Sequence, residues 1–319
     1  MMNIPQLAAE QSLSPSVFSF TGEPFFSKQA YVEMTPQGGL APSACACGGV
    51  GSCTCGAMGT SPSYIYALGT VQTQFPSLSV EKEFYQAVGD ADVDKAPNDA
   101  LYFKYLSQGR NRYIAREMCW TFQIFNTDSY VVKPRSEREL THLISALAPR
   151  PHFTFDVIVG QLGPLAPAEM CNGLQLPILL CDEMYTFTYN EVVETVKDAL
   201  PRGATTDQIV EMLKMAFPLF ANGGQTDAQR AVNFLITRYM AVYTTAWMMM
   251  FTEQDGQKYS FVGVNTQPSV VQGTDRVIDV IFTFRGEKNY DMVRWYTSVA
   301  VQGEFPYILT NMSRYYGGP

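Results

Sequence analysis

Four of the chain's seven cysteines lie within eleven residues, and no other segment constrains the start of the fold as strongly. Cys45, Cys47, Cys53 and Cys55 form two C-x-C pairs that glycines and other small residues separate. Glycine permits the positive φ values of a tight loop, so such a loop can bring four sulfurs together. Four thiolates are the ligands of a tetrahedral structural Zn²⁺ site, and backbone amides can hydrogen-bond to the sulfurs. The segment therefore predicts one structural zinc ion, with no open position for a substrate.

Two other interpretations of this segment stay open. A Gly/Ser linker with free thiols has a similar composition, and the usual zinc spacing is C-x-x-C. A disulfide could also join Cys45 to Cys55 or Cys47 to Cys53, whereas a bridge between Cys45 and Cys47 would be strained. The N-terminus lacks the charged and apolar regions of a signal peptide. We therefore expect a soluble, cytoplasmic protein, in a compartment that keeps thiols reduced and favours metal over disulfides.

The overall composition indicates a folded protein without a basic surface for nucleic acid. Of the 319 residues, 46% are hydrophobic and 13% aromatic, as in chains that form a core. The net charge is −8 and no run of Lys or Arg occurs, which argues against electrostatic binding of nucleic acid. The most apolar helical run, 239–251, is too short to cross a bilayer. We expect neither nucleic acid nor a membrane among the partners.

The chain divides into three parts. Residues 1–43 contain five prolines and several aromatic residues without a sustained period, which indicates an extended arm that lies on another surface. Residues 44–61 are the Cys/Gly-rich loop, and residues 62–319 show the patterns of one globular domain. The surface that receives the arm could belong to a second copy, so we expect a homodimer or a larger assembly.

Helix and strand patterns mix in the globular part without a regular βαβ order, which predicts an α+β fold. The longest helix is expected over 227–251, and its second half is apolar on nearly all sides, so we predict that it is the buried axis of the core. Other helices are expected at 77–88, 98–107, 136–147, 190–199 and 206–220. Strands are expected at 64–72, 113–124, 130–132, 153–159, 176–180, 259–264, 276–285, 293–301 and 307–312.

Few residues are candidates for catalysis. The two histidines, His142 and His152, are expected at the surface, and the chain has no nucleotide-binding or hydrolase motif. A proline-stiffened loop holds Glu169, Cys171 and Asn172, where a thiol nucleophile and a base could act on a peptide. Because no histidine accompanies Cys171, a buried apolar cysteine is the favoured interpretation. The sequence therefore favours a protein that is not an enzyme.

Two arginines lie two turns apart on the expected long helix. If Arg230 and Arg238 point into the fold, each needs a carboxylate partner, because an unpaired buried charge is costly. Otherwise they are ordinary surface charges on the first half of that helix. The candidate partners are Glu81, Glu83, Asp182 and Glu183.

Five strings in the globular part match one family in order. They are Phe75–Phe84, Asn111–Trp120, Ala168–Gly173, Val277–Phe282 and Glu304–Leu309. With these strings, residues 62–316 resemble the C-terminal domain of PatG-type cyanobactin maturation proteins. In that family the domain follows a subtilisin-like protease in peptide natural-product pathways and has no assigned reaction. This chain shows no protease triad motif, so the resemblance implies membership of such a pathway and a peptide partner.

The resemblance and the missing catalytic motifs favour a non-catalytic accessory domain in ribosomal peptide maturation, which engages a precursor peptide or a partner enzyme. One alternative is a structural protein that assembles through its N-terminal arm, and another is an enzyme that uses the Glu169–Asn172 loop on a peptide. The Cys, Ser, Thr and Gly of residues 45–55 also resemble the modifiable core of azole-forming precursor peptides, so this segment could be a substrate instead of a zinc site.

Overall fold

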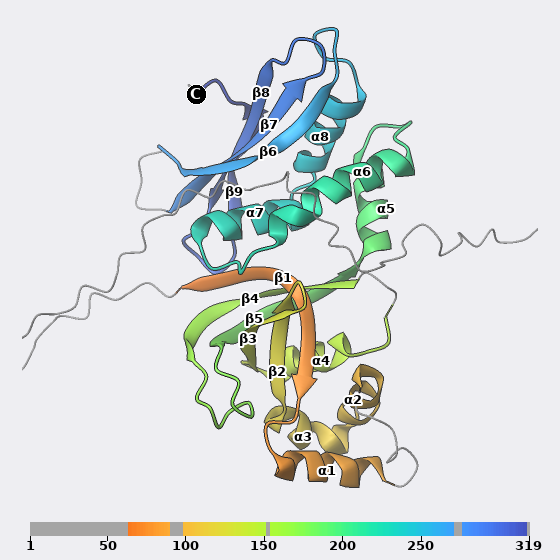
Figure 1. The fold of residues 1–319 in the computed structure, drawn as a ribbon, viewed down its shortest axis with the longest axis vertical. Helices are drawn as coiled ribbons and strands as arrows, with labels where there is room; N and C mark the ends of the chain where they lie inside the picture. The colour runs from red at the N-terminus through yellow and green to blue at the C-terminus, as the bar shows by residue number, and fades with distance from the viewer. Residues whose placement is uncertain (1–62, 90–97, 151–153, 271–275, 318–319) are drawn as a thin grey trace, which may run out of the picture.

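Two β-sheets, with a layer of helices between them, make up the described part of the chain (Figure 1). The structure is a computed structural model, and it describes residues 63–89, 98–150, 154–270 and 276–317. The first sheet is a closed barrel, the second is an open sheet of four strands, and helices connect and cover both. The predicted α+β class is therefore confirmed.

The barrel consists of β1 (Tyr64–Gln74), β2 (Cys119–Ile124), β3 (Thr127–Pro134), β4 (Thr154–Leu165) and β5 (Pro177–Thr188). Its strand order is β1-β2-β3-β5-β4, closed by pairing of β4 with β1. All neighbours are antiparallel except β3 and β5, which are parallel. This order, with one helix between β3 and β4, is the topology of OB-fold barrels.

The β2–β3 hairpin closes with a two-residue turn. Ile124 pairs with Thr127, and both residues between them, Phe125 and Asn126, have positive φ angles of 49° and 59°. Positive φ at both central residues is the mark of the type I′ turn, whose twist matches that of the flanking strands.

Four helices surround the lower part of the barrel in Figure 1: α1 (Leu78–Val88), α2 (Asp99–Leu106), α3 (Arg112–Glu117) and α4 (Glu137–Ala146). Short polar side chains begin three of them, because Ser77, Asn98 and Ser136 each accept a hydrogen bond from a first-turn backbone N–H. The predicted strand over 113–124 is wrong in its first half, which is α3. The Met118 N–H donates to the Ile114 carbonyl at 3.0 Å, four residues earlier as in a helix, and the indole of Trp120 donates to the Ala115 carbonyl at 2.9 Å.

The middle layer contains α5 (Tyr189–Ala199), α6 (Thr206–Ala216), the 3₁₀ turn η3 (Phe217–Phe220), α7 (Asp227–Arg238) and α8 (Ala241–Phe251). The helices α5, α6 and α7 each begin with a capping box, in which Thr188, Thr205 and Thr226 exchange hydrogen bonds with the third helical residue.

The single helix predicted over 227–251 is wrong, because the chain breaks between α7 and α8. Tyr239 adopts an extended conformation, with φ −112° and ψ 92°, and its hydroxyl accepts a hydrogen bond from the Met312 N–H at 3.0 Å. The Tyr243 hydroxyl donates to the Ile236 carbonyl at 2.8 Å, which satisfies a backbone group left free at the end of α7. The apolar run therefore supplies two shorter helices with different neighbours, and not one central axis.

The second sheet is a meander of β6 (Tyr259–Pro268), β7 (Val277–Gly286), β8 (Met292–Ala300) and β9 (Tyr307–Arg314). Its inner face and the outer face of the barrel contribute to the same hydrophobic cluster, with α5 to α8 between them. Val157 and Val159 of β4, Leu235 of α7, and Ile278 and Phe282 of β7 all belong to this cluster. The barrel and the second sheet are therefore joined by a shared core.

At Gly224, just before α7, the backbone of the helical layer closely approaches the backbone of the barrel. Gly224 has a φ of +65°, and a Cβ atom added there would lie 2.1 Å from the Tyr66 carbonyl oxygen in β1. The Tyr66 N–H donates to the Gly224 carbonyl at 3.1 Å, and the Asn233 side-chain amide donates to the Tyr66 carbonyl at 2.8 Å. Only glycine, which has no Cβ atom, can adopt this φ so close to the Tyr66 carbonyl oxygen.

Candidate functional site

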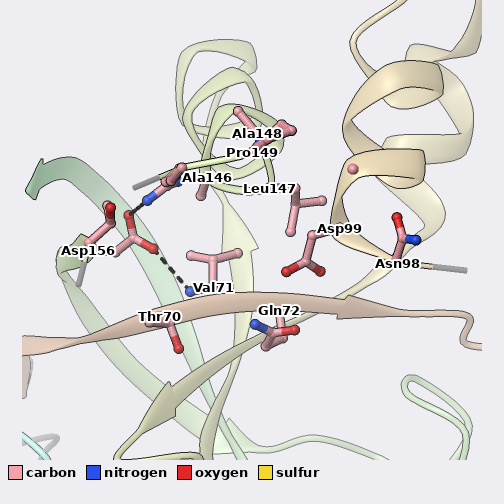
Figure 2. Close-up of a pocket in the computed structure, with 13 residues that line it drawn as sticks. Thr70, Val71, Gln72, Asn98, Asp99, Ala146, Leu147, Ala148, Pro149 and Asp156 are labelled. Atoms are coloured by element: carbon pink, nitrogen blue, oxygen red, sulfur yellow. Dashed lines mark hydrogen bonds and ion pairs between the residues drawn. The ribbon is translucent and has the colours of Figure 1, made fainter. Parts of the chain in front are cut away.

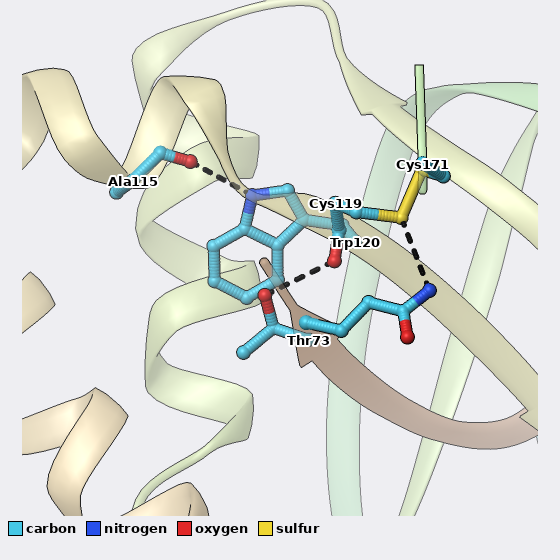
Figure 3. The surroundings of a disulfide bond; sticks show 6 residues. Thr73, Ala115, Cys119, Trp120 and Cys171 are labelled. Carbon is cyan, nitrogen blue, oxygen red and sulfur yellow. Dashed lines mark hydrogen bonds between the residues drawn. A yellow bond between two sulfur atoms is a disulfide. The ribbon is translucent and has the colours of Figure 1, made fainter. Parts of the chain in front are cut away.

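The loop proposed for catalysis is tied to the barrel by a disulfide. Cys171 lies between β4 and β5 and is bonded to Cys119, the first residue of β2, with a Cα–Cα distance of 5.3 Å (Figure 3). Cys171 is buried, as predicted from the sequence, and so is Cys119, but neither carries a free thiol. The Gln74 amide of β1 lies 3.8 Å from the Cys119 sulfur, and the Thr73 hydroxyl donates to the Cys119 carbonyl.

The disulfide removes the chemistry expected of this loop. A thiolate is the nucleophilic form of cysteine, and a disulfide sulfur has no proton to lose. Glu169 and Asn172 are exposed, and Asn172 occupies the turn with a φ of 50°. Cys171 instead belongs to a small apolar cluster with Cys119, Val131 and Ala166. The loop therefore covers the outer face of β2 and β3 and is a structural element.

The predicted zinc ligands, Cys45, Cys47, Cys53 and Cys55, lie outside the described residues. Within 63–89, 98–150, 154–270 and 276–317, no group of three His, Cys, Asp or Glu side chains could hold a metal ion. His152 also lies outside these ranges, and His142 is half-buried, with its Nδ1 2.9 Å from the Met184 carbonyl. Among the helices of the described part, none has the length and hydropathy needed to cross a membrane.

A groove with two indole rings lies where α5, α8 and β8 meet, and we call it the tryptophan groove. Its volume is about 740 Å³. Leu200 and Pro201 after α5 form one wall, Trp247 and Met248 of α8 another, and Trp295 of β8 a third. The walls are therefore mainly apolar and aromatic, as in sites that bind apolar ligands or peptides.

The two indoles of the tryptophan groove differ in their hydrogen bonding. The Trp247 Nε1–H donates to the Gln208 side chain of α6 at 3.0 Å, which fixes that ring. The Trp295 Nε1–H is buried, and no acceptor for it exists among the described residues. The Arg314 guanidinium lies 5.2 Å from the centre of the Trp295 ring and supports it from the neighbouring strand. Because this nitrogen is buried, Trp295 presents its ring carbons and not its N–H to the groove.

A second, polar pocket of about 480 Å³ lies between β1, the start of α2 and the end of α4 (Figure 2). Its buried carboxylate, Asp156, accepts hydrogen bonds from Arg150 at 2.8 Å, Thr186 at 2.6 Å and the Val71 N–H at 3.1 Å. Asp99 points into the pocket, and partial burial raises the pKa of its carboxyl. Because Asp156 makes its hydrogen bonds within the protein, we interpret Asp156 and Arg150 as a structural ion pair and not as a ligand site.

Two family models match the chain in succession. The model described as PatG Domain matches residues 64–217, and the model described as PatG C-terminal matches residues 199–315. The matches overlap and together include every strand from β1 to β9. This chain has a PatG-type domain.

The fold of the PatG-type domain also occurs in a solved structure named "PatG Domain of Unknown Function". The two structures superpose with a TM-score of 0.63 at 16% sequence identity, over 80% of this chain and 99% of that chain. At this identity the likeness shows the fold alone. No curated protein matches the chain.

Neither arginine of the PatG-type domain has the carboxylate partner expected from the sequence. Arg230 is 1% exposed and donates to the backbone carbonyls of Val301, Gly303 and Glu304. Arg238 is exposed and stacks on the Tyr185 ring, 4.0 Å from its centre. The prediction failed for Arg230 because the carbonyls of the β8–β9 connection disperse its charge in place of a carboxylate.

The Glu304 side chain of the PatG-type domain lies against another acidic group. Burial raises the pKa of the Glu304 carboxyl, and the neighbouring Asp182 raises it further. Asp182 itself pairs with Arg135 at 2.8 Å. Glu304 therefore prefers its protonated form more than an exposed glutamate does.

The tryptophan groove was not predicted from the sequence. Its walls come from residues near 200, 247 and 295, and their proximity depends on the break between α7 and α8. One feature of the sequence could have indicated this site, because Trp247 and Trp295 are two of only three tryptophans in the chain.

Proposed function

We propose that this PatG-type domain is a non-catalytic accessory domain in the maturation of ribosomally made peptides of the cyanobactin kind. Its role is to bind a peptide, either a precursor or a segment of a partner enzyme, in the tryptophan groove. The observation that carries the proposal is the apolar lining of the groove, in which the rings of Trp247 and Trp295 lie beside Leu200 and Pro201. The apolar side chains of a peptide fit such walls.

The disulfide supports a binding role over catalysis, because it converts the proposed nucleophile Cys171 into a structural residue. The family assignment supports the pathway, since the PatG-type domain takes its name from proteins of peptide maturation. The proposal includes one structural zinc ion on Cys45, Cys47, Cys53 and Cys55, from the sequence. The cytoplasmic location expected from the sequence is not part of the proposal, because a reducing compartment does not favour the bond between Cys119 and Cys171. Elemental analysis and intact mass distinguish this zinc from azole formation, because each azole removes a water and two hydrogens covalently.

The test is a binding measurement with the full chain. An arrayed library of linear dodecapeptides selects ligands, and calorimetric titration then gives the dissociation constant of each selected peptide. Trp295→Phe removes the five-membered ring of the indole and part of the apolar wall, so it should weaken binding by roughly tenfold, or about 1.4 kcal/mol.

The matched control is Tyr113→Ala on α3, because Tyr113 is an exposed aromatic residue that does not line the tryptophan groove. It should bind every selected peptide as tightly as the wild-type chain. Equal affinity of Trp295→Phe and the wild-type chain for all selected peptides would rule out the tryptophan groove as the peptide site.

A further inference from the structure

We infer that the chain carries its own ligand for the tryptophan groove: the aromatic–proline stretch 15–31 of the N-terminal arm occupies the groove of the same molecule. This inference rests on the proposed function, because it takes the tryptophan groove as a peptide-binding site and identifies residues 15–31 as one peptide that binds there. A partner peptide then has to displace the arm before it can bind.

The groove sets two requirements for its occupant. The walls formed by Pro201, Trp247 and Met248 require apolar side chains. Aromatic-lined grooves also favour proline-containing segments, because these lose little conformational entropy when they bind in an extended form.

The sequence outside the described residues offers one segment that meets these requirements. Residues 15–31 contain Pro15, Phe18, Phe20, Pro24 and the pair Phe25-Phe26, and they end in Tyr31. The internal segment 90–97 contains three aspartates and no aromatic residue, and the segments 151–153 and 271–275 are only three and five residues long. The arm is therefore the occupant that the chain itself can supply.

The connection between the arm and the described fold is long enough for residues 15–31 to reach the tryptophan groove. Between Phe26 and Ser63, where the described fold begins, the chain can extend over about 85 Å even when residues 45–55 are folded around zinc. A domain of this size has a radius of gyration of only about 18 Å, so the arm can reach any point on its surface. Because the arm is covalently attached, its effective concentration at the groove is on the order of millimolar, which favours the groove of the same molecule over that of a second copy.

The three tryptophans allow a direct test in the full chain. A chain labelled with 5-fluorotryptophan gives three ¹⁹F resonances, from Trp120, Trp247 and Trp295, which single Trp→Phe variants assign. In the variant F18S/F20S/F25S/F26S the Trp247 and Trp295 resonances should shift, while that of the buried Trp120 stays unchanged as an internal control. A matched variant with polar changes in the same arm, Q11S/T21S/Q29S, should give the wild-type spectrum.

A synthetic peptide of residues 12–32 provides the second measurement. It should bind the F18S/F20S/F25S/F26S chain at least about tenfold more tightly than the wild-type chain, whose groove is already occupied. It should also return both resonances toward their wild-type positions.

The outcomes separate this inference from the proposed function. If the serine variant leaves both resonances unchanged, the arm does not occupy the groove. Selected dodecapeptides that still shift Trp295 would then leave the proposed function intact, whereas the absence of any shift with any peptide would overturn both. A spectral difference between wild type and variant that disappears on dilution would overturn the intramolecular form, because it assigns the arm to a second copy.

Discussion

The strongest single test of the fold concerns the disulfide between Cys119 and Cys171. The bond closes a loop with a sequence separation of 52 residues, from β2 to the β4–β5 connection. In the chain-entropy model, a loop of this length stabilises the folded state by about 4 kcal/mol at 25 °C. For a domain of this size, each kcal/mol corresponds to about 2–4 °C in melting temperature, so the bond should raise the melting temperature by roughly 10 °C.

The assay compares the same chain with and without the bond. One sample is unfolded and refolded in air and the other with a reductant, and calorimetry gives both melting temperatures. The double variant C119A/C171A is the control, and the reductant should not change its melting temperature. Thiol titration of unfolded, unreduced chain, after removal of any bound metal, should find five free thiols among the seven cysteines. A count of seven, or equal melting temperatures with and without reductant, would refute the reasoning.

Two further predictions concern the contact between the barrel and the helical layer and the acidic pair. Gly224→Ala should destabilise the fold by at least about 2 kcal/mol in chemical denaturation, because its Cβ would lie 2.1 Å from the Tyr66 carbonyl oxygen; Gly203→Ala, where φ is also positive but nothing lies within 4 Å, should cost clearly less. Burial and, next to it, Asp182 raise the pKa of Glu304, so ionisation of Glu304 costs more free energy in the folded state than in the unfolded state. The free energy of unfolding is therefore highest when Glu304 is protonated, and it falls as the pH rises above about 4. Glu304→Gln should therefore melt at a higher temperature than wild type at pH 7, with the difference vanishing near pH 4; a lower melting temperature at pH 7 would contradict this sign.

Local signals in the sequence predicted much of the secondary structure. Asn98 and Thr226 begin helices as expected, since a short polar side chain followed by a helical apolar pattern is a local signal. The strands after residue 259 were also predicted within a few residues, because each is bounded by turn residues and rich in β-branched or aromatic side chains.

The features that the sequence did not predict all depend on contacts between residues that are far apart in the chain. The break at Tyr239 is stabilised by the Met312 N–H in β9, more than seventy residues away, and nothing local marks it. The disulfide was missed because Cys119 and Cys171 are far apart in sequence and because a cytoplasmic location argued for reduced thiols. The tryptophan groove depends in turn on that break, so its location could not be predicted from the sequence.

The bonds at Tyr66 have a consequence for the order in which the protein is completed. Tyr66 lies in the first strand, yet its N–H and C=O bind Gly224 and Asn233, which the ribosome adds only after all five barrel strands. A nascent chain that ends at β5 contains every strand of the barrel but neither of these partners, and the outer faces of β1 and β4 still lack the helices that cover them. The first strand to be made therefore obtains part of its hydrogen bonding only from residues of α7 and the turn before it, so the barrel is complete only in a chain that contains both halves of the domain.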